Sequence, residues 1–263
     1  MVIPCFRCAA TIERAVQSVL AQTVLPAEII LVDDFSDDAG ETLAVLHQMQ
    51  RLDALLPIQV ISMNQNGGPG TARNAAWDMS VQKYIAFLDA DDSWHPQKLE
   101  IQWGWMSIHP RVALSGHGTS ILAEHVAAPE IVTEFVAQPI HFDRLLWKNR
   151  FPTRSVMLLR DISLRFNPGK RYAEDFLLWL KIAAQPMETW FIPVNLAFSF
   201  KQDFGKSGLT ADMWKFEIGE LDCYRQLYSE QAISWIKWMG LVCVSLLKYA
   251  RRCVKVWVRK FRV

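Results

Sequence analysis

Residues 84–92 read Tyr84-Ile85-Ala86-Phe87-Leu88-Asp89-Ala90-Asp91-Asp92, an apolar run of strand length that ends in three carboxylates. In open α/β sheets, ligands bind beyond the carboxyl ends of the strands, so we expect these acids at a ligand site. Carboxylates at this spacing repel one another, and a bound divalent cation that prefers oxygen ligands relieves the repulsion. The alternative is a helix start, in which Asp92 or Ser93 is the N-cap and the other acids are solvated.

Apolar segments of strand length alternate with segments of helical period up to about residue 110, and more loosely beyond it. This alternation predicts βαβ units, and therefore an α/β fold with a mostly parallel sheet flanked by helices. The predicted strands are residues 2–3, 28–32, 58–62, 84–88, 113–115, 155–159 and 196–200. The predicted helices are residues 11–21, 39–52, 71–80, 96–108, 142–147 and 173–184.

The composition indicates a folded chain for a reducing compartment. Its 263 residues are 51% hydrophobic, which is ample for one large domain, or a domain with an appendage. The odd number of cysteines, five, argues against a disulfide framework. No secretory signal opens the chain, so we expect a cytoplasmic location.

Polar side chains also follow the first two predicted strands. Pro4 and Phe6 come after the first strand, where the Phe6 ring can stack on a nucleobase, although burial in the core is the commoner fate of phenylalanine. Asp34 comes after the second strand and can accept the N–H of a uracil or the hydroxyls of a ribose. The alternative for Asp34 is an ordinary turn that it caps.

Two further segments carry charge at predicted helix starts. The glycine-rich turn at residues 64–70 leads into a helix that presents Arg73, whose guanidinium is a forked donor for phosphate or carboxylate. Its spacing is neither the dinucleotide-binding fingerprint nor a Walker loop, and the alternative is a turn with a surface arginine. Glu174 and Asp175 begin a strongly apolar helix, where the ionised state of a general base is favoured. The alternative is that both acids only complement the helix dipole.

These segments together resemble the nucleotide-sugar-dependent glycosyltransferases of family 2, which have the GT-A fold. The resemblance covers residues 1 to about 200 in the family's order. The matching segments are Val2-Ile3-Pro4-Cys5-Phe6, Ser18-Val19-Leu20-Ala21-Gln22-Thr23, Ile30-Leu31-Val32-Asp33-Asp34-Phe35-Ser36, Gly70-Thr71-Ala72-Arg73-Asn74, Phe87-Leu88-Asp89-Ala90-Asp91-Asp92-Ser93-Trp94-His95-Pro96 and Ala173-Glu174-Asp175-Phe176-Leu177-Leu178-Trp179-Leu180.

The resemblance implies a role for each matching residue. Phe6 and Asp34 would hold the nucleoside beside Pro4, and Arg73 would lie near the base or the diphosphate. In the D-x-D pair, Asp91 would be the direct ligand of Mg²⁺ or Mn²⁺, and Asp89 would contact the ribose or the metal.

Its implied reaction is a single displacement with inversion at the sugar. Asp175 would be the catalytic base, with Glu174 as the neighbour that can share this role. UDP is the expected nucleotide, as the commonest in the family. The Gln-x-x-Arg-Trp signature of processive synthases is missing, so we expect the transfer of one sugar per event.

We expect residues 1–210 to form the GT-A domain, with a nucleotide-binding half at 1–110 and an acceptor half at 111–210. Residues 211–263 are expected to be a helical extension. Residues 200–210 resemble the loop that closes over the diphosphate in such enzymes, where Lys201 or Lys206 would meet phosphate. A plain surface loop is the alternative.

The C-terminal tail is basic and rich in tryptophan, and it has no acid after Glu230. Its apolar segment at residues 238–247 is too short to span a bilayer. At helical spacing, one arc holds Lys248, Arg251, Arg252, Lys255, Arg259 and Arg262, opposite Val254, Trp257, Val258 and Phe261.

This pattern predicts an interfacial helix on anionic lipid. The enzyme would then be peripheral on the inner face of the membrane and would act on a glycan or lipid-linked acceptor. The alternative is a helix packed on the body with a solvated basic face. We expect no nucleic acid partner, because no recognition module accompanies the basic residues.

Two other classes of protein are less consistent with these residues. A sugar-nucleotide-forming nucleotidyltransferase would need a first loop rich in glycine and basic residues, which residues 4–10 are not. A catalytically inactive sugar-nucleotide-binding or scaffold protein of the same fold would not need both sets of carboxylates.

Overall fold

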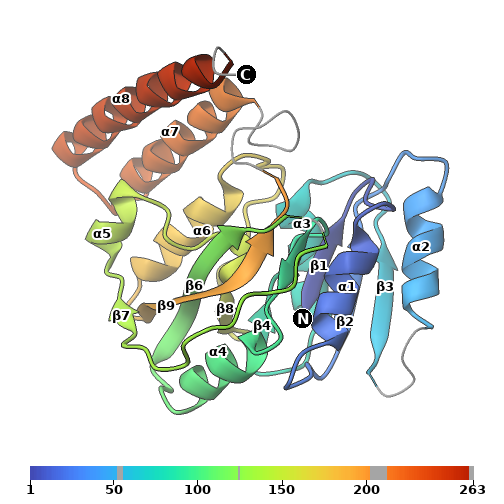
Figure 1. Ribbon diagram of the computed structural model, residues 1–263. Coiled ribbons are helices and arrows are strands. Elements are labelled where there is room, and N and C mark those ends of the chain that lie inside the picture. The colour runs from blue at the N-terminus through green and yellow to red at the C-terminus, as the bar shows by residue number, and fades with distance from the viewer. Residues whose placement is uncertain (52–55, 124, 202–211, 261–263) are drawn as a thin grey trace.

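The computed structural model describes residues 1–51, 56–123, 125–201 and 212–260, and it contains two sheets flanked by helices (Figure 1). The first sheet is parallel, with the strand order β1-β2-β3. Its strands are β1 (Val2–Cys5), β2 (Ile29–Asp33) and β3 (Ile58–Ser62). The helices that alternate with them are α1 (Ile12–Leu20), α2 (Glu41–Met49) and α3 (Pro69–Met79).

The second sheet is mixed, with the order β4-β8-β6-β9-β5 and with β7 also paired to β9. Its strands are β4 (Tyr84–Ala86), β5 (Asp92–Trp94), β6 (Val112–Ile121), β7 (Gln138–Pro139), β8 (Met157–Leu159) and β9 (Glu188–Ser199). Strands β6 and β9 are parallel, whereas the other pairings in this sheet are antiparallel. A parallel bridge between Val2 and Phe87 joins the two sheets.

The predicted α/β fold with a parallel sheet and a C-terminal helical part is confirmed, and the second half of the chain adds antiparallel strands. The remaining helices are α4 (Lys98–Ser107), α5 (Phe142–Trp147), the 3₁₀ helix η1 (Thr153–Ser155), α6 (Glu174–Ala183), α7 (Met213–Ser229) and α8 (Trp235–Lys260). Figure 1 shows α7 and α8 side by side, beyond α5 and α6. The domain limits at residues 110 and 210 stay a prediction, and residue 210 lies outside the described residues. No helix in the described parts of the chain has the length and hydropathy needed to cross a membrane.

Strands β1 and β2 are buried at every residue, as apolar runs covered by helices on both faces must be. Behind the end of β4, the rings of Trp77, Phe87, Phe166 and Trp179 pack against one another with centroids 5.5–6.4 Å apart. Such aromatic clusters are rigid as well as strongly hydrophobic. This cluster therefore fixes the chain just before the acids at residues 89–92.

Several predicted elements differ from the structure in their bounds, and the differences around strand β9 have a clear physical reason. Asp92, Ser93 and Trp94 pair with β9 as strand β5, so the helix begins at Lys98 rather than at Pro96, and the helix-capping interpretation of Asp92 is wrong. The last strand begins at Glu188 rather than at Leu196, and it runs through Pro193, a residue type that is rare inside a strand. A register shift opposite Pro193, between His117 and Gly118 of β6, accommodates the proline.

Candidate active site

A pocket of about 730 Å³ lies where the ends of β1, β2 and β4 meet α6, and residues from both halves of the chain line it. The described residues predicted for the site all belong to this lining: Pro4, Phe6, Asp34, Arg73, Asp89, Asp91, Glu174 and Asp175. Lys206 lies outside the described residues. Acidic and basic side chains are equally numerous in the lining, so the pocket carries little net charge.

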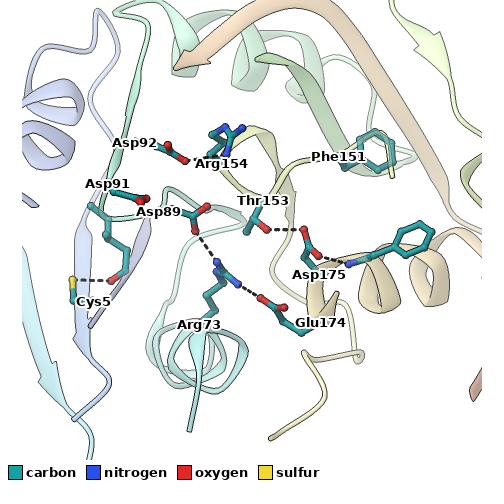
Figure 2. Close-up of polar contacts among 12 residues, drawn as sticks. Cys5, Arg73, Asp89, Asp91, Asp92, Phe151, Thr153, Arg154, Glu174 and Asp175 are labelled. Carbon is teal, nitrogen blue, oxygen red and sulfur yellow. Dashed lines mark hydrogen bonds and ion pairs between the residues drawn. The ribbon is translucent and has the colours of Figure 1, made fainter. Parts of the chain in front are cut away.

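Arg73 joins the two halves of the pocket (Figure 2). Its Nη2 donates to Asp89 Oδ1 at 2.6 Å, and its Nη1 donates to Glu174 Oε1 at 2.9 Å. The bridge needs a close approach between α3 and α6. Gly70 permits this approach, since a Cβ at its position would lie only 3.2 Å from Glu174 Cγ. The Arg73 side chain is 4% exposed, so the alternative of a surface arginine is wrong.

The buried position of Arg73 predicts a large effect on stability. Arg73→Leu would leave Glu174 buried without its partner, and breaking a buried ion pair in this way costs about 3–5 kcal/mol. We expect a loss of this size in the free energy of unfolding, measured by urea denaturation. The matched control is Arg111→Leu, because the Arg111 side chain is 87% exposed in its pair with Glu188. Equal stability of the two variants would contradict this account of the bridge.

Each of the three acids that follow β4 faces a different basic side chain. Asp89 pairs with Arg73, Asp91 with Lys201, and Asp92 with Arg154 at 3.1 Å. Burial raises the pKa of Asp92 to about 7. Arg154 opposes this rise, whereas the charges of Asp89 and Asp91 reinforce it. Asp91 is the most open of the three, with 35% of its side chain exposed.

These carboxylates fit a divalent cation that is shared with a substrate. Within the described residues, no group of three or more His, Cys, Asp and Glu side chains could enclose a metal ion. Mg²⁺ commonly binds through one or two carboxylates together with phosphate oxygens of the substrate. Asp91 opens onto the pocket and already attracts the ammonium group of Lys201, so it offers a carboxylate of this kind.

Asp34 orders the glycine-rich turn before α3. Its two carboxylate oxygens accept the backbone N–H groups of Gly67 and Gly68, both at 2.8 Å. Gly68 has φ +84°, a conformation that favours glycine. Burial raises the pKa of Asp34, although the two N–H bonds oppose this. The contact of Asp34 with a nucleoside stays a prediction.

Phe6 lies at the edge of the pocket rather than in the core. Phe6 is 44% exposed, and the Arg7 guanidinium lies 5.4 Å from the centroid of its ring. The core interpretation of Phe6 is therefore wrong. An exposed ring at the end of β1 is available for stacking on a planar ligand.

Asp175 and Glu174 begin α6 immediately after Ala173, which has the left-handed φ of +54°. Thr153 Oγ1 donates to Asp175 Oδ2 at 2.9 Å, and the backbone N–H of Phe176 donates to Asp175 Oδ1 at 2.6 Å. Figure 2 shows this carboxylate beside the Arg73 bridge. Glu174 is buried, Asp175 is half-buried, and both are hydrogen-bonded, so they do more than complement the helix dipole.

The pKa values of these two acids are raised. Burial raises the pKa of Asp175, while Arg73 and Thr153 oppose the shift. Burial and then the charge of Asp175 raise the pKa of Glu174 to about 7, against the opposing effect of Arg73. A carboxylate with a raised pKa is a stronger base, and such groups are common in active sites.

Several lining residues had no signal in the sequence. Thr153 and Arg154 come from η1, and Phe216 comes from α7. None belongs to a motif, and only the tertiary structure brings them to the pocket. Lys201 was identified from its place in the loop after β9, although as a partner for phosphate and not for Asp91.

Comparisons with known proteins agree with this geometry. A model of the family described as "Glycosyl transferase family 2" matches residues 1–166. TuaG of Bacillus subtilis, named as a teichuronic acid biosynthesis glycosyltransferase, is 31% identical over 235 residues, which are 86% of this chain and 87% of TuaG. The β-1,3-glucosyltransferase WfgD of Escherichia coli is 30% identical over 183 residues, or 69% of this chain and 68% of WfgD.

Solved structures show the same fold at low sequence identity. Residues 1–349 of S. aureus TarS in complex with UDP-GlcNAc superpose with a TM-score of 0.69 at 16% identity, over 93% of this chain and 70% of that chain. The mannosyltransferase PcManGT from Pyrobaculum calidifontis, in complex with GDP-Man and Mn²⁺, superposes with a TM-score of 0.66 at 16% identity. The superposition covers 95% of this chain and 74% of PcManGT. With its family match and its close relatives, the chain belongs to glycosyl transferase family 2 and is a glycosyltransferase with the GT-A fold.

Proposed function

We propose that the chain transfers one sugar from a UDP-linked donor to a hydroxyl group of a glycan or lipid-linked acceptor, with inversion and with the help of Mg²⁺ or Mn²⁺. The observation that carries this proposal is the Arg73 bridge. It holds Asp89, on the side of the nucleotide, next to Glu174 and Asp175, on the side of the acceptor, within one pocket.

Three observations support a nucleotide sugar as the donor. The pocket lies at the carboxyl ends of the parallel strands, with the exposed ring of Phe6 at its edge. Its balanced charge suits a diphosphate whose negative charge is offset by a divalent cation. TarS was solved with UDP-GlcNAc and with UDP, and WfgD is named for a UDP-Glc donor.

In this proposal, Asp91 holds the cation, and Asp89 contacts the ribose or the cation. The hydrogen bond from Arg73 orients the Asp89 carboxylate. The bound cation would stabilise the negative charge that grows on the departing diphosphate. Arg73 adds positive charge beside the same group. Lys201 pairs with one oxygen of Asp91, and a cation that displaced it would leave its ammonium group to meet a phosphate oxygen.

Asp175 is the proposed base. Its carboxylate takes the proton of the acceptor hydroxyl as that oxygen bonds to the anomeric carbon, and the bond from this carbon to the diphosphate oxygen breaks. Attack from the face opposite the diphosphate inverts the anomeric centre. The hydrogen bonds from Thr153 and from the Phe176 N–H hold the carboxylate for this step.

The acceptor and the location belong to the same proposal. WfgD is named for a diphosphoundecaprenol acceptor, which supports a lipid-linked acceptor for this chain. An enzyme that acts on such a substrate must reach the membrane surface. We therefore place the chain in the cytoplasm, peripheral on the inner face of the membrane, with the basic tail as the contact.

Thermal unfolding in the presence of nucleoside diphosphates tests the donor and the cation together. At a ligand concentration about a hundredfold above Kd, linkage stabilises the fold by about 2.7 kcal/mol. For a chain of this size, that corresponds to a rise in Tm of about 5–10 °C. We expect this rise with UDP and Mn²⁺ or Mg²⁺, and a smaller one with UDP and EDTA. If no nucleoside diphosphate raises Tm with either metal, the proposed donor site is wrong.

A further inference from the structure

Helix α8 turns an apolar face away from the protein. Exposed positions recur every three or four residues over residues 235–258, and in this described stretch all are apolar or small except Arg251 and Lys255. We call the apolar and small ones the α8 stripe: Trp235, Ile236, Met239, Gly240, Cys243, Leu246, Leu247, Ala250, Val254 and Trp257. Ile236 is 68% exposed, Leu247 71% and Val254 60%. A continuous apolar face of this length usually marks an interaction surface.

Polar contacts with α7 fix the rotation of α8. Leu241 and Ser245 are buried against α7, and Ser245 Oγ donates to Glu217 Oε1 at 2.7 Å. Arg252 forms ion pairs with Glu217 and with Glu220. The prediction that Arg252 belongs to a basic face turned to lipid or solvent is therefore wrong. Its pairing with the buried Glu217 and the half-buried Glu220 keeps the opposite, apolar side of the helix outside.

The charges beside the α8 stripe select an anionic partner. Arg251 and Lys255 are exposed along one edge of the stripe, and α8 contains no Asp or Glu. A second copy of this chain is a poor occupant, because its own α8 offers no acid that could pair with these bases. Anionic phospholipid supplies both the apolar layer for the stripe and the phosphates for the bases.

We infer that the α8 stripe lies on an anionic lipid surface, with Arg251 and Lys255 at the level of the phosphates. The helix has 26 residues, so it would extend along the membrane plane for about 39 Å. This inference rests on the peripheral location proposed above and not on the transfer reaction. It keeps the interfacial helix predicted from the sequence, and it assigns the contact with the phosphates to Arg251 and Lys255 rather than to the whole basic arc.

The contact would also place the active site beside the membrane. Phe216 of α7 lines the pocket, and its neighbour Glu217 holds Arg252 and Ser245 of α8. Helix α7 thus connects α8, the helix that lies on the lipid, to the pocket. An acceptor with its lipid tail in the bilayer would then present its sugar close to the pocket.

Vesicle flotation of the full chain tests this inference. The test variant is Leu247→Glu with Val254→Glu, and the matched control is Ile108→Glu, since Ile108 is 74% exposed at the end of α4, far from α8 (Figure 1). We expect wild type and the control to float with vesicles of phosphatidylglycerol and phosphatidylcholine. The stripe variant should bind at least about tenfold more weakly, with an unchanged Tm. Arg251→Glu with Lys255→Glu should weaken binding similarly, and added salt should do so for wild type.

Three results would overturn the inference. The first is equal flotation of wild type and the stripe variant. The second is binding of wild type to phosphatidylcholine alone that equals its binding to anionic vesicles, since Arg251 and Lys255 would then have no role. The third is a wild-type dimer, seen by light scattering and lost in the stripe variant, without vesicle binding. Because none of these assays measures sugar transfer, failure of the transfer reaction would leave their outcome unaffected.

Discussion

Asp175→Asn is expected to lower turnover by about a hundredfold to ten-thousandfold, the usual contribution of a general base. Asparagine has nearly the same shape and can still accept the hydrogen bond from Thr153, but it cannot take a proton at this position. The affinity for the nucleotide should change little, because the pocket keeps the Arg73 bridge. The measurements are turnover with the identified donor and nucleotide affinity by calorimetry.

The control for this variant is Asp161→Asn, which changes an acid whose side chain is 88% exposed in its pair with Arg160. It should keep wild-type turnover. If Asp175→Asn also kept it, Asp175 would not be the base, and Glu174, whose pKa is raised to about 7, would be the remaining candidate on α6.

Asp91→Ala is expected to abolish the effect of the cation on nucleotide binding. Metal ligands contribute several kcal/mol to charge stabilisation, so we expect the affinity for UDP with Mn²⁺ to fall by about a hundredfold or more. Without metal, variant and wild type should bind UDP about equally weakly. Isothermal titration with Mn²⁺ and with EDTA measures both effects.

A matched change at a surface acid separates this effect from a general loss of charge. Asp78→Ala removes an acid whose side chain is 63% exposed in its pair with Arg165. It should leave the response to Mn²⁺ intact. An Asp91→Ala protein that still bound UDP more tightly with Mn²⁺ would show that another group holds the cation.

The parts of the site that follow strand ends could be predicted from the sequence. The carboxyl ends of β1, β2 and β4 lie near one another in any sheet of this kind, so the segments that hold Phe6, Asp34 and Asp89 must meet there. Arg73 and Glu174 were predicted from motif resemblance and helix-start chemistry. Each was placed in the pocket separately, but their ion pair had no sequence signal.

The contacts that neutralise the acids could not be predicted. Asp91 meets Lys201 only because β5 pairs with β9. The sequence of β5, Asp92-Ser93-Trp94, resembled the start of a helix more than a strand. Asp92 meets Arg154 through η1, from a part of the chain without a motif. Such pairs depend on the packing of segments that are distant in sequence, which local patterns do not encode.

The orientation of the C-terminal helix could not be predicted for the same reason. The helical period correctly separated a basic from an apolar arc, but it could not indicate which arc faces the body of the protein. That choice depends on Glu217 and Glu220, which lie on another helix and pair with Arg252. Amphipathic pattern alone would have turned Arg252 outwards.

Release of nucleoside diphosphate from a panel of nucleotide sugars shows whether the pocket joined by Arg73 binds a nucleotide sugar with a divalent cation and cleaves its anomeric bond. With Mn²⁺ or Mg²⁺, we predict that the purified chain releases UDP from one UDP-sugar, and that EDTA or Asp91→Ala stops the release. No release from any member of the panel, or release at an unchanged rate in EDTA and in the Asp91→Ala protein, would contradict this prediction.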